Sequence, residues 1–249
     1  MSAASERSER DLPAARPAPS LAERTFPRGP KATAVELLAA YVLLTAIWVG
    51  LGLLITGPLN GSSITEVDQD VATWMVDQRT PALDDWSAVG SLLADTLVKI
   101  IATAVIAVIM LAIWRSWREP LMISLALVLE ASVFITTTWI VARPRPDVEP
   151  LDSSPVDSSF PSGHTAAAAA YGAIAVVIFE RTRNVWIRTV TVVVMIALPI
   201  VVGVARMYRG MHFLTDVVAG TILGVASVVV VYLVFRPARA DEPVALTHR

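Results

Sequence analysis

The chain has 249 residues, a net charge of −2, and a composition that is 55% hydrophobic and 17% charged, with a mean hydropathy of +0.61. This is too apolar for an ordinary soluble domain and indicates a polytopic membrane protein. The near-neutral charge favours no nucleic-acid partner, and the lack of cysteine excludes disulfides, thiolate nucleophiles and zinc–thiolate sites. The chain has three histidines, one of them His248 near the C-terminus, so neither a histidine-rich metal centre nor another cofactor is expected.

Residues 1–31 are rich in Ala, Pro, Ser, Glu and Arg and contain no apolar run. Such a segment cannot bury enough surface to offset its ordering entropy, so we expect a disordered cytoplasmic tail. It does not have the short apolar core and small-residue cleavage site of a signal peptide. We expect one membrane domain over residues 32–236 and a cytoplasmic C-terminal tail over residues 237–249.

Six apolar stretches follow, each close to the ~20 residues needed to cross a bilayer. They lie at about 33–56, 92–114, 120–142, 163–180, 185–205 and 213–235. The expected fold is therefore all-α, a bundle of six transmembrane helices. The first outer loop, about 57–91, carries apolar residues at helical spacing, which predicts one or two short amphipathic helices at the membrane interface.

Basic residues set the expected orientation of these spans. The inner segments would hold the N-terminal basic residues and then Arg115, Arg118, Arg181, Arg183, Arg236 and Arg239. Most acidic residues of the connecting loops fall on the other side, and with an even number of spans the positive-inside rule places both termini in the cytoplasm. The arginines that remain outside are Arg79 and four that belong to the candidate site, namely Arg143, Arg145, Arg206 and Arg209. The site would then face away from the cytoplasm, at the plasma (inner) membrane.

The polar loop at 143–162 leads into Pro161-Ser162-Gly163-His164, where a hydrophobic helix opens. Proline suits the first turn of a helix, serine can cap its free amides, and glycine lets a ligand approach the backbone. The amides of Ser162, Gly163 and His164 would then form an anion-binding helix N-terminus with an imidazole beside it.

His212 and Asp216 are four residues apart at the outer start of the last span, so they share a helix face. The carboxylate can accept a hydrogen bond from one imidazole nitrogen, which leaves the other free as a nucleophile. Arg206 ends the preceding span, and an arginine fork matches phosphate oxygens. His164 would protonate the leaving group. These residues predict a metal-free phosphatase that works through a phosphohistidine intermediate.

The pattern resembles the type 2 phosphatidic acid phosphatase superfamily of membrane lipid phosphatases, which shares its site with soluble bacterial acid phosphatases and vanadium haloperoxidases. The family pattern has three ordered parts, K-x6-R-P, P-S-G-H and S-R-x5-H-x3-D. The second part is complete at residues 161–164, and the resemblance covers about residues 65–235 with the six-span layout. The other matched positions are Arg145, Pro146, Arg206, His212 and Asp216.

Two positions depart from the family pattern. Thr138 stands where the first part has lysine, and Ala205 stands where the third part has serine. The missing lysine removes one expected phosphate contact. We hypothesise that Arg143, two residues before Arg145, or Lys99, one turn into the second span, supplies a substitute charge.

The resemblance implies a role for each matched position. His212 would be the nucleophile, Asp216 its orienting partner and His164 the general acid. The implied phosphate ligands are Arg145, Arg206, Ser162 and Gly163, with Arg143 as a further candidate. The substrate would be a lipid phosphate or diphosphate in the bilayer, with undecaprenyl diphosphate placed before phosphatidylglycerol phosphate and phosphatidic acid. Two other classes stay open: a phosphotransferase, and a non-catalytic lipid-binding or transport protein on the same scaffold.

Overall fold

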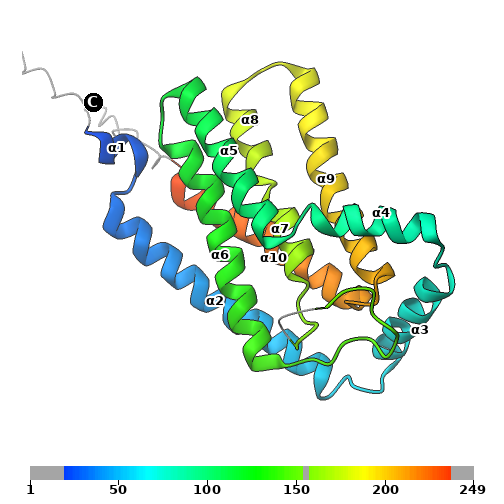
Figure 1. Ribbon diagram of the computed structural model, residues 1–249. Helices are drawn as coiled ribbons and strands as arrows, with labels where there is room; N and C mark the ends of the chain where they lie inside the picture. The colour runs from blue at the N-terminus through cyan, green and yellow to red at the C-terminus, as the bar shows by residue number, and fades with distance from the viewer. Residues whose placement is uncertain (1–19, 154–156, 237–249) are drawn as a thin grey trace, which may run out of the picture.

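The computed structural model describes residues 20–153 and 157–236, and within them the chain is all-helical (Figure 1). Six helical segments are long and apolar enough to cross a membrane, as the hydropathy pattern predicts. The helices are α1 (Leu21–Thr25), α2 (Pro30–Thr56), α3 (Ser63–Asp77), α4 (Pro81–Leu92), α5 (Thr96–Trp114), α6 (Arg118–Val141), α7 (Gly163–Ala170), α8 (Ala173–Arg181), α9 (Val185–Tyr208) and α10 (Leu214–Phe235).

The predicted spans agree with these helices to within four residues at each end. The second span begins later than predicted because Asp95 ends the preceding turn and caps α5, accepting a 2.9 Å hydrogen bond from the amide of Leu97. The fourth span is not one continuous helix. It consists of α7 and α8, which are separated at Tyr171 and Gly172.

The N-terminal end of the described chain is more ordered than predicted. The predicted disordered tail falls mostly on residues 1–19, and the predicted C-terminal tail falls on 237–249; both lie outside the described residues. The last part of the N-terminal tail, however, forms α1 and the start of α2. The apolar ring of Phe26 explains this difference, because it packs on the core with its centroid 6.0 Å from the ring of Phe235 in α10.

The contact between α7 and α10 forms the centre of the bundle. A Cβ atom at Gly220 would overlap the carbonyl of Ser162, and one at Gly224 would overlap the carbonyl of Ala166. Small residues therefore let the two backbones approach closely, as they do between transmembrane helices in general. This contact fixes the start of α7, which carries Gly163 and His164, against the helix that carries Asp216.

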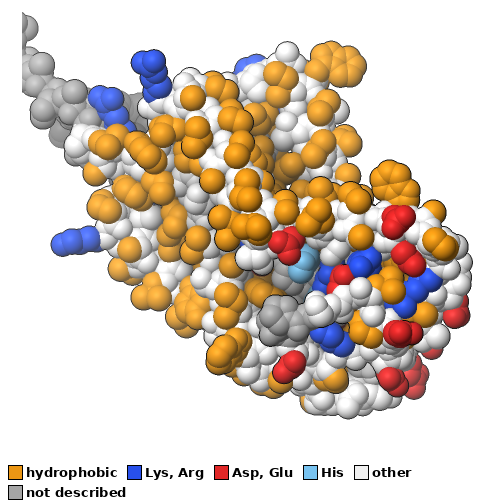
Figure 2. All heavy atoms as spheres, viewed as in Figure 1, with side chains coloured by type: hydrophobic (Ala, Val, Ile, Leu, Met, Phe, Trp, Pro, Cys, Tyr) orange, Lys and Arg blue, Asp and Glu red, His pale blue; other side chains and the backbone are white. Residues whose placement is uncertain are grey.

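The helices α3 and α4 are the amphipathic pair predicted in the first outer loop, and they lie across one end of the bundle (Figure 1). Trp74 and Trp86 on these helices are 57% and 71% exposed, as suits residues at a membrane interface. Figure 2 shows apolar side chains over the flanks of the helices and charged side chains gathered at the end formed by α3 and α4. That end holds the candidate site.

Candidate active site

Five of the predicted site residues line one cavity of about 130 Å³ near the end of the bundle that α3 and α4 cover. Its lining includes Gly163, His164, Arg145, Arg206 and His212. Residues more than 60 positions apart meet here because the ends of α7 and α9, the turn before α10 and the loop after α6 lie at the same end of the bundle. The cavity also receives Lys99, from the first turn of α5.

The imidazole of His212 is buried and held by a backbone carbonyl. Its Nδ1 lies 2.7 Å from the carbonyl oxygen of Ser159. A carbonyl can only accept, so Nδ1 carries the proton and the lone pair remains on Nε2. Burial lowers the pKa of His212 well below its ordinary value of 6.5, and the positive charges of Arg206 and Arg145 act in the same direction. At neutral pH the ring is therefore uncharged, with a lone pair on Nε2.

Asp216 does not hold His212 in the predicted way. Its Oδ2 atom lies 3.9 Å from His212 Nδ1, which is too far for a hydrogen bond. That oxygen accepts instead from the amide of Phe213 at 2.9 Å, in the first turn of α10. The predicted imidazole–carboxylate hydrogen bond is therefore wrong, because the carbonyl of Ser159 occupies the donor position on Nδ1. Asp216 instead fixes the start of α10, next to His212 in the chain.

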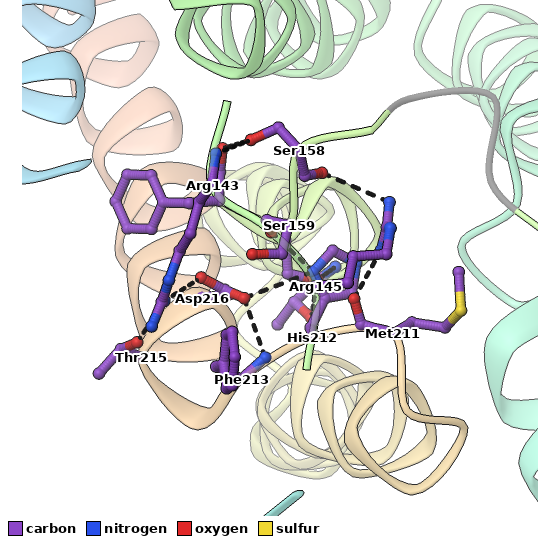
Figure 3. Close-up of polar contacts among 12 residues, drawn as sticks. Arg143, Arg145, Ser158, Ser159, Met211, His212, Phe213, Thr215 and Asp216 are labelled. Carbon is purple, nitrogen blue, oxygen red and sulfur yellow. Dashed lines mark hydrogen bonds and ion pairs between the residues drawn. The ribbon is translucent and has the colours of Figure 1, made fainter. Parts of the chain in front are cut away.

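Arg143 does not line the cavity, and its guanidinium lies beside Asp216 and Thr215 (Figure 3). Its guanidinium donates to Asp216 Oδ1 at 2.5 Å, to Thr215 Oγ1 at 2.8 Å and to Asp68 Oδ2 at 2.8 Å. It also lies over the ring of Phe213, 4.2 Å from the centroid. These contacts do not support the predicted phosphate contact of Arg143; they tie it to the start of α10.

The hydroxyl and the amide of Ser162 both form hydrogen bonds within the protein. Its hydroxyl lies 2.9 Å from Thr165 Oγ1 and caps α7, and its amide donates to the carbonyl of Asp216 at 3.0 Å. It is not among the residues that line the cavity, whereas the adjacent Gly163 is. A Cβ atom at Gly163 would lie 2.7 Å from the ring of Phe134. A larger residue would therefore displace either this ring or the start of α7.

The two predicted arginine ligands line the cavity and are both anchored. Arg145 donates to the carbonyl oxygens of Met211 at 2.5 Å and Ser158 at 3.3 Å. Arg206 donates from Nη1 to Ser91 Oγ at 2.8 Å and to Asp152 Oδ2 at 2.9 Å. Its Nε is buried and has no hydrogen-bond partner among the described residues. A buried donor without an acceptor is costly, so this guanidinium retains hydrogen-bonding capacity that the fold does not use.

Neither departure from the family pattern lies in the cavity lining. The hydroxyl of Thr138 donates to the carbonyls of Phe134 and Ile135 within its own helix. Ala205 lines an apolar groove between α4 and α9, where it faces Gly90. Lys99 from α5 lines the cavity and so brings a cation to it. That Lys99 replaces the missing lysine stays a prediction.

Asp152 is a part of the site that the sequence did not indicate. Its carboxylate accepts from Arg206 at 2.9 Å and from Arg209 at 2.6 and 2.7 Å. One carboxylate therefore orients two guanidinium groups. A second cavity of about 360 Å³ opens beside it and shares His164 and Arg206 with the first. Asp152 lies in a proline-rich loop with no helical spacing, so no pattern in the sequence connects it with Arg206.

Replacing Asp152 by asparagine is expected to lower the kcat/KM of any phosphate-releasing activity about 10-fold and to lower Tm by a few degrees. The hydrogen bond from Arg209, helped by the charge of Arg206, holds the pKa of Asp152 below its ordinary value of 3.8. A depressed carboxyl pKa contributes stability that is complete above 3.8 and is lost as the pH falls through the lower folded value. The Tm difference from wild type should therefore stay constant from pH 8 to pH 5 in thermal melts.

Asp147→Asn is the matched control for this prediction, since Asp147 lies exposed in the same loop. It should behave as wild type. A Tm gap that closes between pH 8 and pH 5, or an equal loss in the control, would contradict the role assigned to Asp152.

Comparison with known proteins gives an independent view of this site. Residues 119–240 match the model of the PAP2 superfamily. The chain is 32% identical over 87 residues to the "Bacitracin transport permease protein BcrC" of Bacillus licheniformis; this match spans 35% of the chain and 38% of that relative.

Two solved structures have a similar fold. The PAP2 type phosphatidylglycerolphosphate phosphatase from Bacillus subtilis superposes with a TM-score of 0.64 at 23% identity, over 79% of this chain and 92% of that one. Aquifex aeolicus LpxE superposes with a TM-score of 0.52 at 25% identity, over 67% of this chain and 94% of that one. The matched family segment includes the three ordered parts of the pattern at Arg145, 161–164 and 206–216. The chain is thus a multi-pass membrane protein with a fold similar to that of PAP2-type phosphatases, and its residues 119–240 match the PAP2 superfamily.

Proposed function

We propose that this protein hydrolyses a lipid phosphate or diphosphate through a phosphohistidine intermediate on His212, at the extracytoplasmic face of the plasma membrane. The observation that carries the proposal is the cavity in which His212 and His164 meet Arg145, Arg206 and Lys99. Two imidazoles and three cations at the ends of apolar helices suit a phosphate group whose lipid tail stays in the bilayer.

The chemistry follows from the atoms that face the cavity. Nε2 of His212 attacks phosphorus while the bond to the leaving oxygen breaks, and His164 donates a proton to that oxygen. Arg145, Arg206 and Lys99 stabilise the charge on the transferring phosphoryl group. Water, deprotonated by His164, then attacks the phosphohistidine and breaks the N–P bond, which releases phosphate and restores the neutral Nε2.

We propose that this reaction needs no metal ion. The positive charges around the cavity belong to arginine and lysine side chains. In addition, no group of three or more His, Cys, Asp or Glu residues within 20–153 and 157–236 is placed to hold a metal ion.

The orientation proposed for the site rests on the distribution of charge. Arg118 and Arg181, at the opposite end of α6 and α8 from the cavity, pair with Glu180 and Glu119. The basic segments therefore lie at the end away from the site, and the positive-inside rule makes that end cytoplasmic. The side of the cavity would be the extracytoplasmic side.

Undecaprenyl diphosphate is the first candidate substrate, since an outward-facing, metal-free site suits the recycling of a lipid carrier. Phosphatidylglycerol phosphate is the second, because the structure from Bacillus subtilis is named a phosphatidylglycerolphosphate phosphatase. Phosphatidic acid is the third. Thr138 and Ala205, the two departures from the family pattern that favour the non-catalytic alternative, do not line the cavity, which supports the catalytic proposal.

The test is phosphate release from these three lipids by the purified protein in detergent with EDTA. We expect EDTA-resistant release, fastest from undecaprenyl diphosphate. If labelled phosphate moved to an organic acceptor without free phosphate appearing, the phosphotransferase would be supported. Lipid binding with no turnover of any of the three lipids would support the binding protein instead.

A further inference from the structure

A buried carboxylate from the first outer loop reaches the active site. Asp68 lies on α3, and it and Ala72 are the buried residues of that helix. Asp68 is 1% exposed, although Glu66 and Asp70 on the same helix are exposed. A carboxylate is rarely buried unless it is paired, so its partners indicate its role.

The partners of Asp68 all belong to the active-site region. Oδ2 accepts from the guanidinium of Arg143 at 2.8 Å and from the hydroxyl of Thr215. Oδ1 accepts from the amide of Thr215 at 3.0 Å. Thr215 is in the first turn of α10, where helix amides have no partner within the helix. Asp68 therefore caps α10 from outside and anchors Arg143 at the same time.

The same guanidinium then connects Asp68 to Asp216. Arg143 donates to Asp216 Oδ1 at 2.5 Å. The side chains of Asp68, Arg143 and Asp216 are each at most 5% exposed. One cation is thus shared by two buried carboxylates, and Figure 3 shows the Arg143–Asp216 pair beside His212. The cluster lies next to the imidazole that, in the proposed reaction, becomes positive as it attacks phosphorus.

We propose that Asp68 is a positioning residue of the active site, acting through Arg143 and Thr215 to hold Asp216 and the turn that carries His212. The proposal rests on the phosphatase function proposed above. Asp68 lies outside the segment matched by the family model, residues 119–240, so nothing in that match assigns it a role. The outer loop would then supply part of the catalytic arrangement in addition to covering it.

The expected signature of Asp68→Asn is a loss in the chemical step without a loss of phosphate binding. Asp68 does not line the cavity, so kcat should fall about 10- to 100-fold while KM and the inhibition constant of inorganic phosphate stay within about twofold of wild type. Asp70→Asn, an exposed change of the same chemistry on the same helix, should be indistinguishable from wild type.

A double-mutant cycle tests whether Asp68 acts through Arg143. If it does, Asp68→Asn in an Arg143→Ala background should cost much less than in wild type, so the effects should be strongly non-additive. A wild-type kcat for Asp68→Asn, full additivity with Arg143→Ala, or a matching loss of phosphate affinity would each overturn the proposal.

Hydrogen exchange separates this proposal from the proposed function. In Asp68→Ala, which unlike the asparagine variant has no acceptor oxygen, the amide of Thr215 loses its hydrogen-bond partner, so a peptide over residues 213–217 should exchange faster than in wild type or Asp70→Ala. If wild type released no phosphate, the proposed function would fail, and unchanged exchange in this peptide would separately overturn the anchoring role of Asp68.

Discussion

The His212→Ala variant is expected to lose phosphate release by a factor on the order of 10⁴ or more, because the proposed reaction then has no nucleophile. In wild type the ring is already prepared for attack, because the Ser159 carbonyl accepts a hydrogen bond from Nδ1–H and burial keeps the imidazole neutral. Among the described residues that line the cavity, His212 has its imidazole held by a backbone carbonyl, so we expect no substitute nucleophile.

A trapping experiment distinguishes a nucleophile from a general base. His164 is proposed to activate the water that hydrolyses the phosphoenzyme, so His164→Ala should accumulate label from a ³²P-labelled lipid after an alkaline quench. The label should be released by acid, as expected of a phosphohistidine. His212→Ala should take up no label.

His248→Ala is the matched control, since His248 is the remaining histidine of the chain and lies outside the motifs. It should keep wild-type turnover. Labelling of His212→Ala at the level of His164→Ala would show that the covalent intermediate forms elsewhere, and it would remove His212 from the nucleophilic role.

The Lys99→Met variant is expected to lose about 100-fold in kcat/KM, with a weaker inhibition by inorganic phosphate. Methionine keeps the apolar stem of the side chain and removes the ammonium group. Lys99 lines the cavity together with His164 and His212. The hydroxyl of Tyr171 donates to the backbone carbonyl of Lys99 at 3.0 Å, which fixes the position of this turn of α5. Lys99 is therefore our choice for the cation that replaces the lysine of the family pattern.

Comparison with Arg143→Ala separates the two predicted substitutes for that lysine. Arg143 should affect kcat with little change in phosphate inhibition, since its guanidinium is engaged by Asp68 and Asp216. Lys31→Met provides the control, because Lys31 is the other lysine of the chain and is exposed at the start of α2. If Lys99→Met retained wild-type kcat/KM and phosphate inhibition, Lys99 would have no part in binding phosphate.

The sequence by itself determined the six spans and five of the residues that line the cavity. A span is decided by local composition, since about 20 consecutive apolar residues suffice to cross a bilayer. The stretch 161–164 and the spacing of His212 from Arg206 likewise place chemistry at helix ends, where neighbours in sequence are neighbours in space. These features need no knowledge of how the helices pack.

Hydrogen-bond partners were decided only by the tertiary structure. The spacing of His212 and Asp216 allowed a hydrogen bond, but whether it forms depends on Ser159, which is 53 positions away from His212. The sequence left the choice between Arg143 and Lys99 open for the same reason. Arg143 is close to Arg145 in the sequence and Lys99 lies on another helix, so spacing cannot distinguish them. The packing of the helices decides that Lys99, and not Arg143, lines the cavity.

Asp68 and Asp152 were beyond sequence reasoning altogether. In the sequence each is one acidic residue among several in an outer loop, and neither has a spacing that connects it to the motifs. Their roles arise because buried guanidinium groups need counter-charges, and the closest carboxylates in space come from distant loops. The sequence therefore determined which groups carry the proposed chemistry, and the tertiary structure decided which groups hold them in place.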